Sequence, residues 1–301
     1  MIAGGVITVT PNPAVDLSYQ LPHLVSFHKL RIGALVEDPG GGGINVARVL
    51  KALGTKATAL TLLGGPTGEM MAKLLDLSGV DWRCVRIAGD TRLSINLHTT
   101  GEPGEFRLVP DGPNVTAAEW GALLALVDQT DAAWVVASSS LPPGLPDDAY
   151  ATLARRCHAA GRKIAIDTSD RALPSLRGRG IDLLKLSQSE LRVLAPGFAS
   201  DELAARSLIA DGTALRLAVT LGEQGAWLAD SAGFSHVPAI PVEVKSTVGA
   251  GDAFLAGLVD ALARGKTDQE ALKWANATAA AAVAHEGTAH VTLEAVKALA
   301  G

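Results

Sequence analysis

The chain has 301 residues, of which 48% are hydrophobic, and this is enough to bury the core of a large α/β domain. Its 26 Lys and Arg residues against 31 Asp and Glu residues leave a formal net charge of −5, without the basic excess typical of a nucleic-acid binder. Two scattered cysteines suit a reducing compartment, and neither a signal-peptide pattern nor a long apolar run occurs. We therefore expect a cytoplasmic globular protein without a nucleic-acid or membrane partner.

Short apolar runs alternate with stretches of helical period along most of the chain. The runs typical of buried strands are Val6–Thr10, Ala57–Leu63, Ala133–Ala137, Lys163–Asp167, Asp182–Leu186 and Leu217–Leu221. The helices expected between them end close to a glycine and are Ile44–Leu53, Glu69–Leu77, Asp147–Ala160 and Ala250–Arg264. This alternation predicts an α/β fold with a central, mainly parallel sheet flanked by helices on both faces.

Two segments interrupt this alternation. Val15–Val36 and Val85–Val109 carry alternating strand patterns without a helix between the strands, and the second is expected to turn at residues 101–104. We expect them to form a small β-strand lid on one domain that spans residues 1–301, since no linker divides the chain.

A short glycine turn opens directly into an apolar helix at Ser246–Gly257. Free N–H groups and the helix dipole at such a start form an anion site, and Gly249 and Gly251 let the backbone approach a phosphate. Asp252 lies in the first turn, where its charge would repel a bound anion, so its presence indicates chemistry. It is placed to act as a general base that takes a proton from an attacking hydroxyl. The alternative is that Asp252 only caps the helix.

A second glycine run, Pro39-Gly-Gly-Gly-Gly-Ile-Asn-Val-Ala-Arg48, also leads into a helix. Four consecutive glycines are costly in backbone entropy, which is justified where the chain passes close to a polar ligand, and Asn45 can then hydrogen-bond a sugar. The alternative is a flexible loop. A dinucleotide fingerprint at residues 249–254 is disfavoured, because Phe254 stands where a small residue is needed, and a dehydrogenase is correspondingly a weaker hypothesis.

Taken together and in order, the motifs of this chain resemble those of the ribokinase-like carbohydrate kinases, specifically the phosphofructokinase B branch. The motifs are Thr10–Asp16, Gly40–Arg48, Thr91-Arg92, Ser138–Gly144, Thr220–Gly225 and Ser246–Asp252. This resemblance implies a ribokinase-like fold and an ATP-dependent sugar kinase with ATP and Mg²⁺ as cofactors.

The resemblance also implies roles for single residues. Asp252 is implied to be the catalytic base, beside an anion hole made by the backbone amides of Gly249, Ala250 and Gly251. The residues implied to hold the sugar hydroxyls are Asp16, Gly41, Gly42 and Asn45. Those implied to lie near the sugar and its existing phosphate are Lys29, Arg92 and Ser140. Lys29 and Arg92 fall in the lid segments, so lid closure would bring cations to a phosphorylated sugar and exclude water.

On the nucleotide side, the resemblance places Thr220, Gly222 and Gly225 along the phosphates and ribose and Asn276 near the adenine. Lys185 is implied to reach the phosphates, and Glu190 to position a hydrated magnesium ion. Ser246 and Val248 are grouped with the cofactor-binding residues, and it stays open whether a monovalent cation binds near them.

One element departs from the family pattern. Ser187 and Leu186 stand where the family usually has Asn and Pro. Serine lacks the amide donor, so a contact with phosphate or hydrated metal is expected to be weaker or mediated by water. The alternative is that Ser187 simply caps a helix.

The substrate expected from the resemblance is fructose 6-phosphate. The glycine run of Gly40–Gly43 resembles that of the minor bacterial 6-phosphofructokinase, whereas Thr10–Asp16 resembles 1-phosphofructokinases and tagatose-6-phosphate kinases. A sugar-phosphate-binding regulator without turnover is the alternative from another class. Exposed lid edges favour a homodimer.

Overall fold

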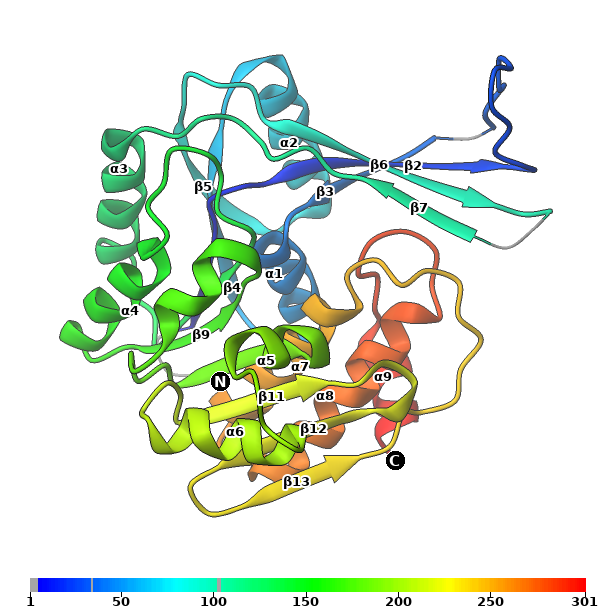
Figure 1. Ribbon diagram of the computed structural model, residues 1–301. Coiled ribbons are helices and arrows are strands. Elements are labelled where there is room, and N and C mark those ends of the chain that lie inside the picture. The colour runs from blue at the N-terminus through cyan, green and yellow to red at the C-terminus, as the bar shows by residue number, and fades with distance from the viewer. Residues whose placement is uncertain (1–4, 34, 102–103) are drawn as a thin grey trace.

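The computed structural model describes residues 5–33, 35–101 and 104–301, and their strands form two separate sheets (Figure 1). The larger sheet has nine strands within these residues, in the order β13-β12-β11-β10-β9-β8-β1-β4-β5. They are β1 (Val6–Thr10), β4 (Ala57–Leu63), β5 (Asp81–Arg86), β8 (Trp134–Ser138), β9 (Lys163–Asp167), β10 (Leu183–Ser187), β11 (Arg216–Thr220), β12 (Ala226–Asp230) and β13 (Phe234–Val237). Pairing is parallel from β5 through β11 and antiparallel for β12 and β13. The mainly parallel sheet expected from the sequence is confirmed.

Helices cover both faces of this sheet. One face carries α3 (Ala117–Asp128), α4 (Ala149–Ala159), the 3₁₀ helix η1 (Asp170–Leu176), α5 (Gln188–Leu194) and α6 (Asp201–Ala210). The other carries α1 (Gly42–Ala52), α2 (Gly65–Ser78), α7 (Ala250–Ala263), α8 (Asp268–Val283) and α9 (Leu293–Ala300). A short 3₁₀ helix, η2 (Gly222–Gln224), joins β11 to β12. Because both faces are covered, the central strands are buried throughout, which explains why they appear as continuous apolar runs.

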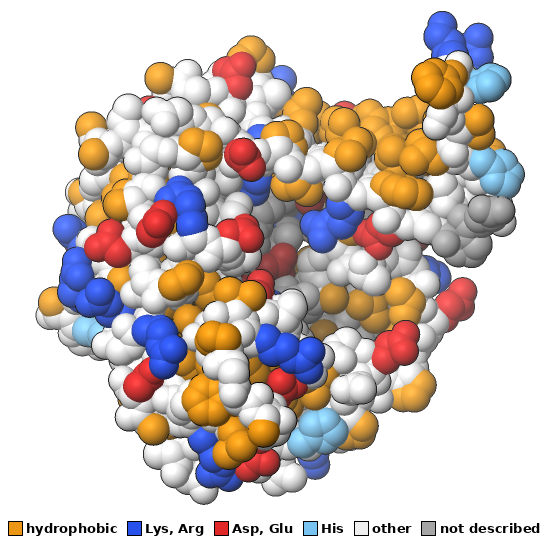
Figure 2. Space-filling view, in the orientation of Figure 1, with side chains coloured by type: hydrophobic (Ala, Val, Ile, Leu, Met, Phe, Trp, Pro, Cys, Tyr) orange, Lys and Arg blue, Asp and Glu red, His pale blue; other side chains and the backbone are white. Residues whose placement is uncertain are grey.

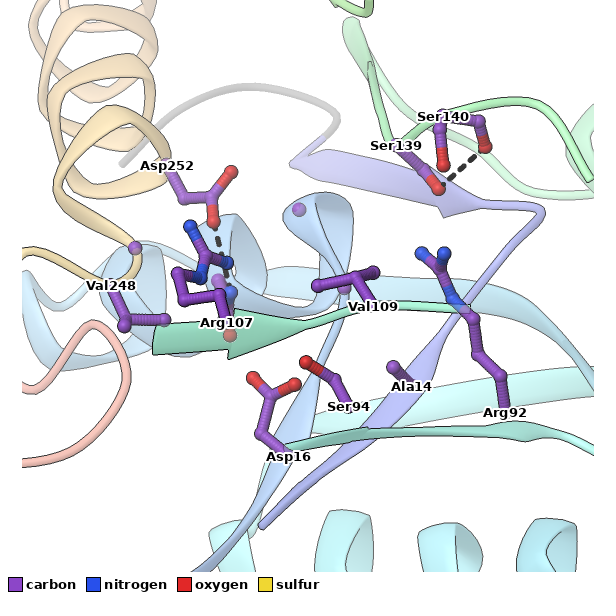
Figure 3. A pocket seen from close by; sticks show the side chains of 14 residues that line it. Ala14, Asp16, Arg92, Ser94, Arg107, Val109, Ser139, Ser140, Val248 and Asp252 are labelled. Carbon is purple, nitrogen blue, oxygen red and sulfur yellow. Dashed lines mark hydrogen bonds between the residues drawn. The ribbon is translucent and has the colours of Figure 1, made fainter. Parts of the chain in front are cut away.

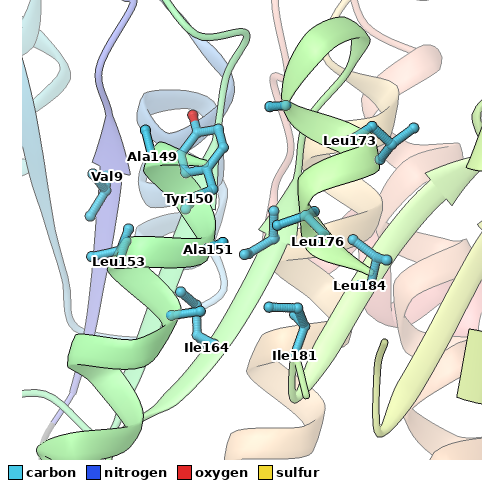
Figure 4. Packing of buried hydrophobic residues seen from close by; sticks show 14 of the residues in the cluster. Val9, Ala149, Tyr150, Ala151, Leu153, Ile164, Leu173, Leu176, Ile181 and Leu184 are labelled. Atoms are coloured by element: carbon cyan, nitrogen blue, oxygen red, sulfur yellow. The ribbon is translucent and has the colours of Figure 1, made fainter. Parts of the chain in front are cut away.

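A hydrophobic core lies on each face of the main sheet, and the one beneath α4 and η1 shows how helices pack against the strands. Tyr150 and Leu153 of α4 and Leu176 of η1 are fully buried against β9 and β10 (Figure 4). Burying a side chain of this size contributes about 1.5–3 kcal/mol relative to exposure. The Tyr150 hydroxyl donates to the carbonyl of Ser139, 2.9 Å away, so this core also fixes the loop after β8.

The smaller sheet, here called the lid, has the strand order β3-β2-β6-β7. Its strands are β2 (Ala14–Leu21), β3 (Leu35–Gly40), β6 (Arg92–Thr99) and β7 (Gly104–Leu108). The lid extends away from the main sheet (Figure 1). The expected second lid range began too early, since Val85 and Arg86 belong to β5 of the main sheet. Of the expected turn at 101–104, residues 102 and 103 lie outside the described residues.

Within the described ranges, no helix combines the length and apolar character that crossing a membrane requires.

Candidate active site

The first turn of α7 borders a pocket between the lid and the main sheet. The helix is preceded by Gly249, whose φ of 79° is left-handed and whose position leaves no room for a side chain, because a Cβ there would lie 2.7 Å from the Cβ of Ala289. A Cβ on Gly251 would lie 2.9 Å from Lys185 Nζ. A lysine ammonium therefore stands beside the N-terminal amides of α7, and both features favour an anion at this point.

Asp252 does not cap α7, so the capping alternative is wrong. Its Oδ2 accepts a hydrogen bond from Asn45 Nδ2 at 2.9 Å, and its Oδ1 accepts one from Ser138 Oγ at 3.4 Å. Burial raises the pKa of Asp252, while the hydrogen bond from Asn45 and the charge of Lys185 act in the opposite direction. The net shift of the pKa of Asp252 is upward, and the group keeps two hydrogen-bond donors on its carboxyl oxygens.

The pocket has an empty volume of about 520 Å³, part of which is open to solvent. It is lined by Ala14, Asp16, Gly41, Gly42, Asn45, Arg92, Ser94, Arg107, Val109, Ser139, Ser140, Val248, Gly249 and Asp252. Figure 3 shows Arg92, Ser139 and Ser140 at one end and Asp252 with Val248 at the other. The hollow between lid and body is visible in Figure 2.

The glycine run before Asn45 is tightly packed, so the flexible-loop alternative is wrong. Gly41 has a φ of 113°, and α1 begins at Gly42. A Cβ on Gly42 would lie 2.1 Å from Ser138 Oγ and 2.9 Å from Asp252 Oδ1. Glycine at this position lets the start of α1 approach the carboxylate closely.

Arg92 is held at the end of the pocket away from Asp252. Its Nη1 donates to the carbonyl of Pro110 at 2.7 Å, and its Nη2 donates to the carbonyl of Asn12 at 3.0 Å. Its Nε is buried without a partner among the described residues. Ser140 Oγ accepts a hydrogen bond from Asn12 Nδ2 at 3.3 Å, which keeps the serine beside the arginine. Such a fixed guanidinium with an unused donor suits a phosphate.

Asp16 enters the pocket from β2. It lies opposite Ser94 in the register with β6, and its Oδ2 accepts a hydrogen bond from Thr288 Oγ1 at 3.3 Å. Burial raises the pKa of Asp16 to about 6, although this hydrogen bond and the charge of Arg107 lower it.

Among the residues expected to bind the sugar phosphate, Lys29 is the one that does not line this pocket. It is exposed in the segment between β2 and β3, which continues beyond the outer end of the lid (Figure 1). Arg107 of β7 lines the pocket instead, and the sequence analysis missed it. Strand alternation could have found it, because Arg107 pairs with Asn96, which lies two residues beyond Ser94 on the same face of β6.

Lys185 projects from β10 toward the start of α7. Its Nζ lies 3.0 Å from Oδ2 of Asp167, a residue of β9 that the sequence analysis did not select. Burial raises the pKa of Asp167 to about 6, and the charge of Lys185 opposes this shift. The position of Lys185 beside Gly251 agrees with the expected role at the phosphates.

Ser187 and Glu190 form a capping box at the start of α5. Ser187 Oγ accepts from the backbone N–H of Glu190, and Glu190 Oε2 accepts from the N–H of Ser187 at 2.7 Å. Ser187 therefore caps α5, as the alternative interpretation of this residue expected. Thr220, at the end of β11, lies next to Ser187 in the parallel register.

A magnesium ion that is held mainly by water and by the phosphates of a nucleotide needs one or two carboxylates nearby and no cluster of protein ligands. The described residues contain no cluster of three or more His, Cys, Asp or Glu side chains that could hold a metal. Glu190 keeps one carboxylate oxygen outside the capping contact, as an outer contact to hydrated magnesium requires.

The remaining expected nucleotide residues lie on three elements, which are the η2 turn, α8 and the segment before α7. Gly225 has a φ of 92°, and a Cβ there would lie 2.1 Å from the carbonyl oxygen of Val237, while Asn276 Nδ2 donates to the carbonyl of Pro238 at 2.8 Å. Gly222 begins η2 with a φ of 60°. In the segment before α7, Ser246 Oγ accepts from the backbone N–H of Val248 at 3.2 Å.

The chain is similar in sequence and in structure to known carbohydrate kinases. A family model described as pfkB family carbohydrate kinase matches residues 12–295. The ATP-dependent 6-phosphofructokinase isozyme 2 of Mycobacterium tuberculosis is 38% identical over 290 residues, covering 94% of this chain and 85% of the relative. The 1-phosphofructokinase of Haloferax volcanii is 34% identical, covering 96% of this chain and 94% of the relative. The structure of phosphofructokinase-2 from Escherichia coli with substrates and products has a TM-score of 0.93 at 32% identity and covers 98% of both chains.

Proposed function

Because the chain belongs to the pfkB family of carbohydrate kinases, we propose that it transfers the γ-phosphoryl group of ATP to the 1-hydroxyl of fructose 6-phosphate. The products are fructose 1,6-bisphosphate and ADP. The observation that carries the proposal is the position of Asp252. Its carboxylate lies in the first turn of α7 without capping the helix, and Arg92 lies at the opposite end of the same pocket. We further propose that residues 1–301 form one catalytic domain; its cytoplasmic location stays a prediction.

Asp252 serves as the general base. Its carboxylate takes the proton of the sugar hydroxyl as that oxygen attacks the γ-phosphorus, and the bond to the leaving oxygen of ADP breaks in line. The amides of Gly249, Ala250 and Gly251 stabilise the negative charge that spreads over the transferred group. Lys185, beside Gly251, adds a positive charge on the nucleotide side.

The other end of the pocket selects a phosphorylated sugar. Arg92 supplies a positive charge with its guanidinium already fixed, and Ser140 supplies a hydroxyl beside it. Asp16 and Asn45 hold sugar hydroxyls, and Arg107 adds a second cation from the lid. A sugar without phosphate would leave Arg92 without an anion to meet, so it is the poorer substrate.

ATP binds along Lys185, Thr220, Gly222, Gly225 and Asn276. Magnesium, when bound, neutralises the charge of the ATP phosphates. Glu190 is the residue that holds its water shell, and Ser187, committed to capping α5, contributes less than an asparagine would.

The test is ADP release with ATP and magnesium and four acceptors: fructose 6-phosphate, fructose 1-phosphate, tagatose 6-phosphate and unphosphorylated fructose. We expect the highest kcat/KM for fructose 6-phosphate. Preference for either other sugar phosphate would keep the mechanism and change the substrate.

The Asp252→Asn variant should lose about 10²–10⁴-fold in kcat while nucleotide binding survives. Asp131→Asn, which changes an exposed carboxylate, should leave kcat unaltered. Absence of turnover with every acceptor would support the binding-only regulator.

A further inference from the structure

Arg48 of α1 is a nearly buried cation that joins three segments beside the pocket without lining it. Its side chain is 10% exposed. Nη1 donates to Asn45 Oδ1 at 3.3 Å and to the carbonyl of Thr288 at 3.0 Å, while Nη2 lies 3.3 Å from Asp38 Oδ1. Asn45 is on α1, Asp38 is on lid strand β3, and Thr288 is on the segment between α8 and α9.

The contact with Asn45 decides which way that carboxamide faces. A guanidinium can only donate hydrogen bonds, so it holds the oxygen of the amide and turns the NH₂ group the other way. The NH₂ group then donates to Asp252 Oδ2 at 2.9 Å. A reversed amide would place its oxygen against the carboxylate and would remove this donor.

We propose that Arg48 is a positioning residue for Asp252, which acts by fixing the orientation of the Asn45 amide. This inference rests on the proposed function, in which Asp252 is the base. Without Arg48, the amide would turn over for part of the time, and the carboxylate would be held less firmly toward the sugar hydroxyl. A loss of the Asn45 hydrogen bond would also raise the pKa of Asp252, since that bond lowers it.

A competing explanation is that Arg48 only neutralises Asp38. Asp38 is 6% exposed and also accepts a hydrogen bond from the backbone N–H of Thr288 at 3.2 Å, and His290 Nε2 lies 3.2 Å from its Oδ1. In that case the loss of Arg48 would lower the stability of the fold, and the change in kcat would not depend on Asn45.

A double-mutant cycle separates the two explanations. We would measure kcat with fructose 6-phosphate for Arg48→Met, Asn45→Ala and the double variant. We expect Arg48→Met to lower kcat about tenfold, as for a lost hydrogen bond to a charged group, and the double variant to fall no further than Asn45→Ala alone. Independent effects that multiply in the double variant would overturn the inference.

The pH dependence of kcat is the second readout. Both single variants should move the acid limb to higher pH, because Asp252 loses a donor that stabilises its ionised form. The charged groups that face Asp252 from neighbouring elements are Lys185 on β10, Arg107 on β7 and Asp167 on β9, and these variants leave all three in place. An unmoved acid limb in Arg48→Met would count against the inference.

Two further variants test whether a loss of stability alone explains the lower kcat of Arg48→Met. Asp38→Asn combined with Arg48→Met removes both members of the ion pair, so Asp38 is not left as a charge without its arginine, yet the contact with Asn45 is still lost; we expect the same fall in kcat. His290→Ala removes the other side-chain partner of Asp38 and a contact with Arg48 Nη2, but it leaves the contact between Arg48 Nη1 and Asn45 in place, and kcat should stay within twofold of wild type. Restored kcat in the first variant would show that Arg48 acts only through charge.

A wild-type protein with no transfer to any acceptor would refute the proposed function as well, whereas normal transfer with an additive cycle would refute only the role of Arg48.

Discussion

Two carboxylates, Asp16 from the lid and Asp252 from α7, line the same pocket, and the protein keeps both despite the cost of burying charge. Asp16 is 6% exposed, and its hydrogen-bond donors, Thr288 and Ser94, are neutral hydroxyl groups. Burial favours the protonated form by more than these donors and the charge of Arg107 oppose it, so the pKa of Asp16 rises to about 6. The ionised form of Asp16 therefore lowers the stability of the fold at neutral pH, and it provides a hydrogen-bond acceptor in the pocket.

The raised pKa of Asp16 gives a stability prediction with a definite sign. The folded state binds a proton near pH 6 and the unfolded chain near 3.8, so the free energy of unfolding contributed by Asp16 rises as pH falls from about 7 to about 4. Asp16→Asn should therefore stabilise the protein at pH 8 by about 1–3 kcal/mol, with the gain fading near pH 4, while kcat/KM for the sugar phosphate falls. Denaturant unfolding at both pH values measures this, with the exposed Asp81→Asn as control. An equal effect of Asp16→Asn at both pH values would contradict the assignment.

Strand β7 links the lid to the loop that precedes α7. Glu105 Oε2 accepts a hydrogen bond from Thr247 Oγ1 at 2.8 Å, across 142 residues of sequence. The same strand carries Arg107 into the pocket, so this contact positions a lid cation over the site. Glu37, on β3, pairs with Leu17 and therefore lies on the opposite face of the lid from Asp16.

Loss of the Glu105 contact should weaken lid closure. For Glu105→Ala we expect the KM for the sugar phosphate to rise about threefold to tenfold, as for one lost hydrogen bond to a charged group, with a smaller change in kcat. Steady-state kinetics against sugar phosphate at saturating ATP measures this. Glu37→Ala removes a lid carboxylate from the other face and should leave the KM unchanged, and equal KM values for both variants would argue against a closing role for Glu105.

At the scale of the whole molecule, the lid carries an apolar face directed away from the pocket. Leu35 pairs with Tyr19, Leu108 with Ile95 and Phe106 with Leu97, so these side chains share one face. Leu35, Phe106 and Leu108 are 41%, 44% and 55% exposed. Hydrophobic side chains gather over the lid in Figure 2. A contiguous apolar face of this kind is typical of a surface that binds another protein.

We predict that this face pairs two copies of the chain into a homodimer, which would also shield the edge strands β3 and β7. Light scattering should give the mass of a dimer for the wild type and of a monomer for Leu108→Asp, because a buried carboxylate in the interface would be left unpaired. Leu77→Asp changes a leucine that is 84% exposed on α2, outside the lid, and should leave the dimer intact. A monomeric wild type would refute the prediction.

The alternation of strands and helices and both glycine turns could be predicted from the sequence alone. These features are local, because an apolar run or a glycine after a helix acts within a few residues, and the expected strands and the observed β1, β4 and β9 coincide end to end. The resemblance to pfkB kinases placed Asp252, Asp16 and Arg92 in one site, and the pocket brings these three together.

The contacts between side chains that are far apart in the sequence became known from the three-dimensional structure. Asn45 reaches Asp252 over 207 residues, which settled that this carboxylate is held by a donor and does not cap its own helix. Packing also moved Val85 into the main sheet and brought Arg107 to the pocket, while Lys29 was left at the end of the lid. Such contacts depend on how sheets and helices stack, and a pattern read along a single chain carries no information about partners that far apart.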